Sequence, residues 1–315
     1  MQRTFRIVFH VTGVILSVTN RVGFLINIIL IWYNAASYLI SGIYWTILSG
    51  LTGNKTQWEF SHDYYSVYCT QGPHRDKMLD RFAILDNGTT TVNQIAGFAV
   101  FSGFGYPGFA NTVEATLLRE IMDKIMPSKW ATVTELSELL NNTVQIFDQK
   151  MLDGPFGEAV CGASALIGVV YANIFVLANL GNCRAVEAKL IEAAGGRVIL
   201  KKGQWRVDGI LPISRALGGG RLKKQGWISA KPSISWYDLR NDPVEYVILA
   251  TKGLWKAVSS HEASRIVEKY KNRPGFGAKQ LVRKAREKNL KGDICVMIAK
   301  FKKDSTLKRC IEFEN

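Results

Sequence analysis

A long uncharged segment near the start of the chain is the strongest constraint on how the chain can be organised. Residues 22–49 contain no Lys, Arg, Asp, Glu or His over 28 consecutive positions. About 20 apolar residues suffice to cross a hydrocarbon core, whereas a buried helix of a soluble domain rarely continues so far without a charge. The segment also holds five aromatic residues that suit a membrane interface, namely Trp32, Tyr33, Tyr38, Tyr44 and Trp45. We therefore expect residues 22–49 to enter a membrane.

The residues before this segment leave its topology open. A second apolar stretch, 5–19, is too short to span well alone and is a candidate for half of a hairpin. A cleavable signal peptide is less favoured, because the apolar character resumes at Val22 and no small-x-small site separates the two stretches. A single pass with basic residues before Val22 would place the rest of the chain outside the cytosol, whereas a hairpin would return it. We expect a membrane location, with a single-pass or hairpin anchor and the remaining domain on the cytosolic side.

The formal net charge is +14, and much of the excess lies late in the chain. Between Arg265 and Arg309 there are fifteen Lys or Arg residues against four acids, on a pattern that predicts a helix followed by a strand and a tail. Such a segment is typical of a solvated helix face, or of a surface for anionic lipid or an acidic partner. No nucleic-acid-binding motif accompanies the charge, so nucleic acid is not an expected partner.

The cysteines indicate neither a metal site nor a disulfide framework. There are five of them, an odd number, and none forms a CxxC pair. We expect a reducing compartment and inert, small apolar side chains at all five positions: Cys69, Cys161, Cys183, Cys295 and Cys310.

Beyond Lys55 the pattern changes to short β-rich runs broken by Gly and Pro, with helices between them. The predicted strands are 95–101, 164–170, 174–180, 246–251 and 294–301, and the predicted helices are 110–125, 133–150 and 260–270. This mixture favours an α/β (α+β) sandwich, with a central β-sandwich flanked by helices. The expected domains are a hydrophobic anchor at 1–54, one globular domain at 55–303 and a basic tail at 304–315.

Six blocks of the globular domain resemble the protein phosphatase 2C family, in the family's order. GFAVFSGFGYPGFAN, from Gly97, is similar to the FDGHGG strand and turn. CGASALIGVVYANIFVLANLGNCRAVEA, from Cys161, resembles the SGTTA and ANVGDSRAVL strands. The remaining family elements are similar to four further blocks: GGRV from Gly195, LPISRALGGGRLK from Leu211, YVILATKGLWKAVS from Tyr246 and GDICVMIAKF from Gly292. The resemblance implies a phosphatase 2C-like fold.

The same resemblance implies a chemistry for which this chain lacks the ligands. Family members use two Mg or Mn ions, held by carboxylates, to activate a water that attacks phosphoserine or phosphothreonine. Position by position, the ligand Glu becomes Leu79, the bridging Asp becomes Ser102, its neighbouring His becomes Phe104, and three further Asp residues become Asn182, Lys252 and Gly292. We expect no catalytic residue, no metal and no other cofactor.

Three charged residues of this chain fall at positions of the family pattern near the phosphate or the metals. Arg75 matches an Arg that contacts the substrate phosphate, Asp80 matches an acid near the metals, and Asp293 occupies an Asn position. With Lys252 replacing an Asp, Arg75 and Lys252 are candidate phosphate ligands. The predicted function is that of a membrane-tethered pseudophosphatase that binds or scaffolds a phosphorylated protein, or a kinase or receptor partner.

Two alternatives stay open at this point. One is a weakly active Mg/Mn-dependent Ser/Thr phosphatase that recruits metal through Asp80 and Asp293. The other is drift in a decayed copy, which the intact apolar strand patterns disfavour, because random damage would affect the core as well as the metal positions.

Overall fold

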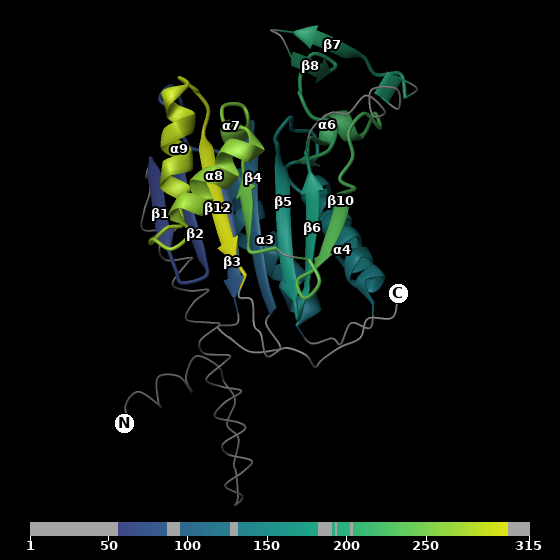
Figure 1. The fold of residues 1–315 in the computed structure, drawn as a ribbon. Coiled ribbons are helices and arrows are strands. Elements are labelled where there is room, and N and C mark those ends of the chain that lie inside the picture. Colours follow the sequence, from purple (N-terminus) through teal and green to yellow (C-terminus); the bar gives the residue numbers. More distant parts are fainter. Residues whose placement is uncertain are drawn as a thin grey trace, which may run out of the picture. The chain divides into compact units, whose positions relative to one another are not determined.

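Two antiparallel β-sheets form the centre of the folded unit (Figure 1). The computed structural model describes residues 56–86, 95–126, 132–181, 191–192, 194–201, 204–242 and 244–301, all within the compact unit Asn54–Asn315. One sheet has the order β1 (Gln57–Ser61), β2 (Tyr65–Thr70), β12 (Ile294–Lys300), β11 (Tyr246–Ala250). The other has the order β10 (Ser233–Asp238), β6 (Ile174–Leu180), β5 (Gly162–Tyr171), β4 (Ile95–Phe104), β3 (Asp80–Asp86), with β9 (Leu217–Gly218) pairing to β5.

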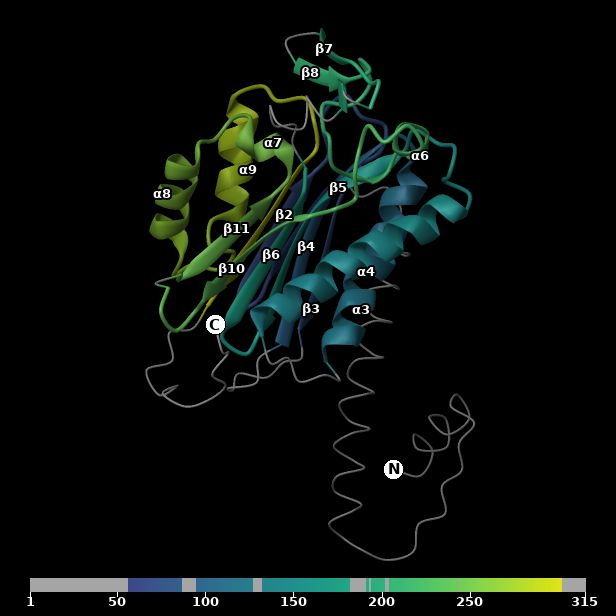
Figure 2. The same cartoon turned by 90° about the vertical axis from the view of Figure 1, so that its right-hand side faces the viewer.

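Helices cover both outer faces of the paired sheets (Figure 2). The six-stranded sheet is covered by α3 (Pro107–Ile125) and α4 (Val133–Asp153), and the four-stranded sheet by α7 (Lys252–Trp255), α8 (Ser260–Tyr270) and α9 (Ala278–Glu287). Aromatic contacts link the two sheets: the ring centroids lie 5.8 Å apart for Tyr65 and Phe98, and 5.4 Å apart for Phe175 and Phe301. The predicted mixed α/β fold is confirmed.

Local sequence explains why the α3–α4 layer forms. Pro107 starts α3, where its fixed φ suits the first turn, and a fully buried stripe that includes Leu117 and Ile121 faces the six-stranded sheet. The second helix begins at a capping box, in which Thr132 accepts from the Glu135 amide and the Glu135 carboxylate accepts from the Thr132 amide. These signals place both helices where the apolar periodicity predicted them.

A smaller element lies beyond the ends of the strands. It contains the hairpin β7 (Val198–Lys201) and β8 (Gln204–Val207) and the short helix α6 (Gly220–Lys223). Its own apolar cluster includes Val207, Leu211, Leu222 and Ile228, separate from the clusters under the helical layers. Leu200 of this hairpin is exposed.

The basic segment late in the chain forms two helices before its strand, not one. Residues 271–277 separate α8 from α9. The second helix was missed because half of its residues are Lys, Arg or Glu, with only Leu281, Val282 and two alanines forming its buried stripe.

The membrane prediction falls outside the part of the chain that the structure describes. Residues 22–49 and the predicted tail 304–315 are not among the described residues. Within the described ranges, no helix is both long and apolar enough to cross a bilayer.

The expectation of five inert cysteines was wrong for two of them. Cys69 and Cys295 are directly opposite one another on β2 and β12, with Cα atoms 4.0 Å apart, and their sulfurs form a disulfide across 226 residues of sequence. Cys161 is buried and free, and Cys183 and Cys310 lie outside the described residues. Spacing alone cannot reveal this pair, since only the sheet order brings its two strands together.

Reduction should therefore destabilise the folded unit. A typical disulfide contributes about 2–4 kcal/mol to the free energy of unfolding, and each kcal/mol shifts the Tm of a domain of this size by about 2–4 °C. Prolonged incubation of the full chain with dithiothreitol should lower its Tm by roughly 5–15 °C in a calorimetric scan. The Cys69→Ala/Cys295→Ala variant should show no such response. An equal response in both proteins would contradict the pairing.

Candidate functional site

Three loops meet at one end of the sandwich, and two glycines let them approach closely. A Cβ atom added to Gly72 would lie 2.2 Å from the carbonyl oxygen of Lys291, and one added to Gly253 would lie 2.3 Å from that of Asp293. Because such contacts do not occur between real atoms, only glycine fits at either position. The loop after β2, the turn after β11 and the loop before β12 are therefore packed against one another.

Asp293 fastens the loop that follows β2. Its carboxylate is buried and accepts from the amide of Gly72 at 2.8 Å through Oδ1 and from the amide of Leu79 at 2.7 Å through Oδ2. Hydrogen bonds to a charged group contribute about 1.5–3 kcal/mol each. Arg75, between these two anchor points, has its Nε atom 3.9 Å from Asp293 Oδ1, and 42% of its side chain is exposed. The loop thus presents the Arg75 guanidinium to solvent from a fixed base.

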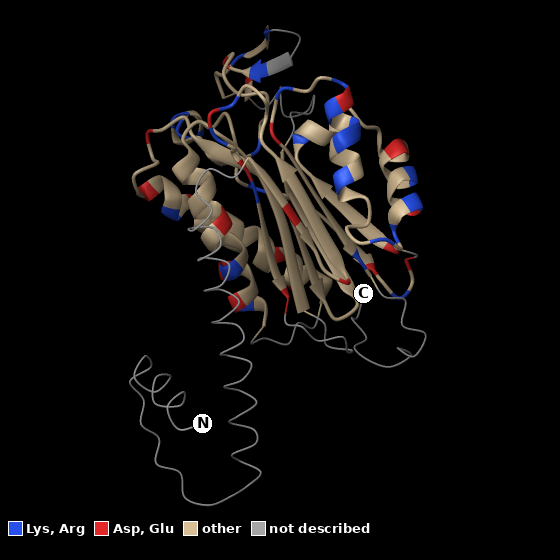
Figure 3. Ribbon diagram, turned by 90° about the vertical axis from the view of Figure 1, so that its left-hand side faces the viewer, with Lys and Arg blue, Asp and Glu red and all other residues tan. Residues whose placement is uncertain are grey.

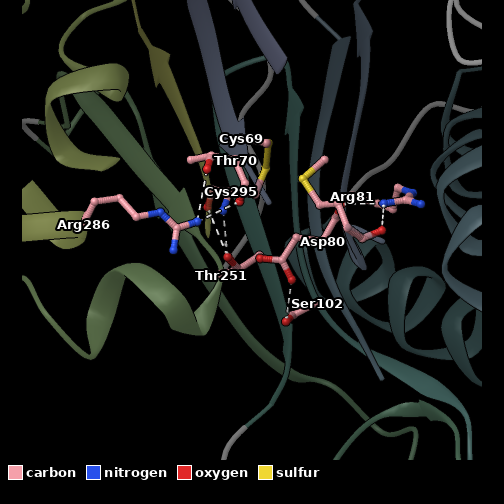
Figure 4. Close-up of a disulfide and its surroundings, with 9 residues drawn as sticks. Cys69, Thr70, Asp80, Arg81, Ser102, Thr251, Arg286 and Cys295 are labelled. Carbon is pink, nitrogen blue, oxygen red and sulfur yellow. Dashed lines mark hydrogen bonds between the residues drawn. A yellow bond between two sulfur atoms is a disulfide. The ribbon is translucent and has the colours of Figure 1, made fainter. Parts of the chain in front are cut away.

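Asp80 is a buried carboxylate beside this loop. It opens β3 opposite Ser102 of β4, whose hydroxyl donates to Asp80 Oδ1 at 2.8 Å (Figure 4). The Oδ2 atom is buried and has no hydrogen-bond partner among the described residues. Burial raises the pKa of Asp80 from 3.8 to about 6, while the hydroxyls of Thr251 and Ser102 act in the opposite direction. Asp293 raises this pKa further and Arg75 lowers it.

The structure gathers several of the predicted site residues. Arg75, Asp80, Ser102 and Asp293 lie together, and Thr251, which interacts with Asp80, directly precedes Lys252. Lys252 is half-buried at the first residue of α7.

Other predicted positions serve the backbone or a different cluster. Leu79 is buried, and its carbonyl accepts from the Gly103 amide at 3.1 Å. The Gly292 carbonyl accepts from Arg286 at 2.7 Å. Phe104 packs against the cluster that contains Leu211. Asn182 lies outside the described residues.

The sequence did not predict the roles of Arg286 and Thr251, which hold the backbone next to the site by hydrogen bonds. Arg286 of α9 donates to the carbonyls of Thr70, Gln71, Leu290 and Gly292 and to the Thr70 hydroxyl, at 2.7–3.1 Å. Figure 4 shows Arg286 beside Thr70. Thr251 accepts from the Cys295 amide at 2.9 Å, directly behind the disulfide. A lone Arg on a basic helix gives no sequence signal for such a role.

Comparison with known proteins places this arrangement in a family. Residues 185–294 match protein phosphatase 2C. Protein phosphatase 1L of Bos taurus is 32% identical over 276 residues, which cover 79% of this chain and 75% of that protein. The chain belongs to the protein phosphatase 2C family. A probable protein phosphatase 2C of Arabidopsis thaliana is 29% identical over 262 residues, covering 75% of this chain and 67% of that protein.

Solved structures show the same fold. The serine-threonine phosphatase 2C from Toxoplasma gondii superimposes with a TM-score of 0.63 at 16% identity, covering 78% of this chain and 99% of that one. A sex determining protein of C. elegans gives a TM-score of 0.64 at 20% identity, covering 84% and 73%. The family resemblance drawn from the six sequence blocks is confirmed.

The residues present do not fit the two metal ions that the family generally uses. Within the described ranges, no three His, Cys, Asp or Glu side chains are grouped so that they could hold a metal ion. Both Asp293 oxygens accept backbone amides, which leaves the Oδ2 atom of Asp80 as the one buried acidic oxygen of this cluster without a hydrogen-bond partner. Two adjacent divalent ions need several carboxylates to offset their repulsion, and Lys252 adds positive charge.

Because burial raises the pKa of Asp80, the free energy of unfolding should depend on pH. Between its ordinary pKa of 3.8 and about 6 the folded chain holds a proton that the unfolded chain has released. The contribution of this group to stability therefore falls as the pH rises through that window. Relative to the unmodified chain, Asp80→Asn should gain about 2–3 kcal/mol of unfolding free energy between about pH 4 and pH 7, as measured by urea denaturation.

A second variant tests the cause of the shift. Ser102→Ala removes a hydrogen bond that stabilises the ionised carboxylate, so the fall in stability with rising pH should become larger than in the unmodified chain. If the stability of Asp80→Asn relative to the unmodified chain did not change with pH, Asp80 would have to ionise at its ordinary pKa.

Proposed function

We propose that this protein is a pseudophosphatase that binds a phosphorylated protein without metal-dependent hydrolysis. The observation that carries the proposal is the set of residues at four positions where the family resemblance implies metal-binding carboxylates, namely Leu79, Ser102, Lys252 and Gly292. Without metal, a water molecule keeps its bulk pKa of about 15.7 rather than about 7 and is a poor nucleophile. The protein phosphatase fold would then serve as a binding module.

Arg75 and Lys252 are the proposed phosphate ligands. The half-exposed Arg75 guanidinium offers a planar fork of donors, and a lysine ammonium adds a point charge. The nearby carboxylates oppose an anion only in part, because Asp293 accepts from two amides and lies 3.9 Å from Arg75, and Asp80 is buried and accepts from Ser102. The net effect favours a phosphate at the exposed edge of the cluster.

A weakly active phosphatase is the alternative function. It would recruit Mg or Mn through Asp80 and Asp293, with backbone carbonyls and water as further ligands. The amide contacts of Asp293 count against it, since they take one acceptor site on each oxygen and hold the carboxylate against the loop that carries Arg75.

We further propose that residues 22–49 tether the domain to a membrane on its cytosolic side. The support is the sequence alone: 28 positions without an ionisable side chain and aromatic residues suited to an interface. In this arrangement the protein would hold a phosphorylated kinase, receptor or other partner at the membrane.

Phosphate-dependent binding tests the main proposal. The full chain in detergent should bind a phosphoserine peptide more tightly than the same peptide with serine, measured by fluorescence anisotropy. Arg75→Ala and Lys252→Glu should each lower that affinity by about tenfold or more, because each removes a charge-assisted contact. Arg119→Glu, an exposed change on α3, is the control and should have no effect. Equal binding of both peptides, or unchanged binding in both site variants, would rule out the proposed site.

Membrane fractionation tests the tether. After extraction of expressing cells with alkaline carbonate, the full chain should stay in the membrane pellet, and a chain lacking residues 22–49 should move to the supernatant. Recovery of both forms in the supernatant would contradict the tether.

A further inference from the structure

A groove lies beside α9, next to the candidate phosphate site. Its volume is 470 Å³, and its walls include Tyr68 and Thr70 of β2 and Arg283, Arg286 and Glu287 of α9. α9 buries Leu281 and Val282 against the four-stranded sheet, while Arg283 is exposed. Figure 3 shows that Lys and Arg outnumber Asp and Glu along the helical layer over this sheet. The groove is therefore bordered by arginines on its helical side.

The charge along this side is not balanced by neighbouring acids. Glu287 pairs with Lys284, Glu59 with Lys279, and both Glu245 and Glu268 with Lys271. Arg283, Lys288 and Lys291 are exposed, and no acid among the described residues lies within 4.0 Å of their charged groups. Lys288 donates to the carbonyl of Ala257, which holds its ammonium at the end of α9. A set of like charges without an acidic partner within 4.0 Å favours an anionic ligand over solvent alone.

Arg286 connects the groove to the phosphate site. Arg286 lines the groove, and its guanidinium donates to the carbonyls of Gln71 and Gly292, the residues from which the Arg75 loop and the Asp293 loop continue. Asp293 and Asp80 both act on the pKa of Arg286, which burial lowers. Arg286 thus contacts both regions, which makes the groove a neighbour of the candidate phosphate site.

We infer that this groove and the basic end of α9 bind an acidic segment next to the phosphorylated residue of the partner. The inference rests on the proposed function and narrows its ligand to phosphoserine or phosphothreonine flanked by Asp or Glu. Several weak ion pairs at the surface together supply the selectivity for an acidic segment. Added salt screens these pairs. The peptide backbone lies along the groove beside Tyr68 and Thr70, with its carboxylates toward Arg283, Lys288 and Lys291.

The test uses the full chain in detergent and three fluorescent phosphoserine peptides that share one length and core sequence. One carries three Asp residues before the phosphoserine, one carries them after it, and one carries Asn in their place. At low salt, one of the acidic peptides should bind about tenfold more tightly than the Asn peptide. In Arg283→Glu/Lys288→Glu this preference should disappear, while the affinity for the Asn phosphopeptide stays unchanged.

The matched control has the same change of charge on the opposite helical layer. Arg119→Glu/Lys150→Glu on α3 and α4 should keep the preference. Phosphate-dependent binding without any preference for acidic flanks would overturn this inference and leave the proposed function standing. No phosphate-dependent binding to any peptide would overturn both.

A second experiment distinguishes an anionic lipid surface from an acidic peptide as the ligand of the basic face. Flotation with phosphatidylserine and with phosphatidylcholine vesicles should show no difference that depends on Arg283 and Lys288. A phosphatidylserine preference that the double variant abolishes, together with equal binding of all three peptides, would assign the basic face to a membrane surface and overturn the inference.

Discussion

The geometry of the site depends on one buried carboxylate that holds two backbone amides. Asp293 binds Gly72 and Leu79, the two ends of the loop that carries Arg75. Because the carboxylate is buried, losing either amide would leave a charge without solvation, at a cost of more than 1–3 kcal/mol for a group of this kind. Arg286 and the Cys69–Cys295 disulfide secure the strands on either side. The Arg75 loop is therefore fastened at both ends, and its Arg75 side chain is partly exposed.

Metal-dependent phosphatases combine two properties, a tightly packed fold and a negatively charged site. The packing of the fold is retained: glycines still allow close approach of the loops, and apolar side chains still fill both helical layers. At the site, Ser102 donates to Asp80, and Lys252 opens α7. Under the proposed function, binding of a phosphate by cations needs the packing of the fold and not a negatively charged lining.

Much of the fold could be predicted from sequence, and the failures have physical causes. β6 and α8 have the predicted ends, because their apolar patterns stop at clear boundaries. β1 and β2 were missed, since Trp, Tyr, Ser and Thr dominate them and β2 joins the sheet through β12, more than 200 residues away. α9 was missed because tertiary packing of a narrow stripe, rather than local apolar content, stabilises it.

The candidate site, like the fold, could be predicted only in part. Positions that follow the family motifs, such as Asp80 and Ser102, could be placed side by side from sequence. The role of Asp293 was not foreseen, because a carboxylate that binds amides and one that binds metal look alike in a sequence. The disulfide and Arg286 depend on contacts between distant strands and loops, for which one sequence carries no signal.

With so few free carboxylates, the cluster around Asp80 should not hold divalent ions. Anomalous scattering from crystals of the full chain grown with millimolar manganese measures this. No anomalous peak is expected within coordination distance of Asp80, Ser102 or Asp293. Two ordered manganese ions beside these residues would contradict this expectation.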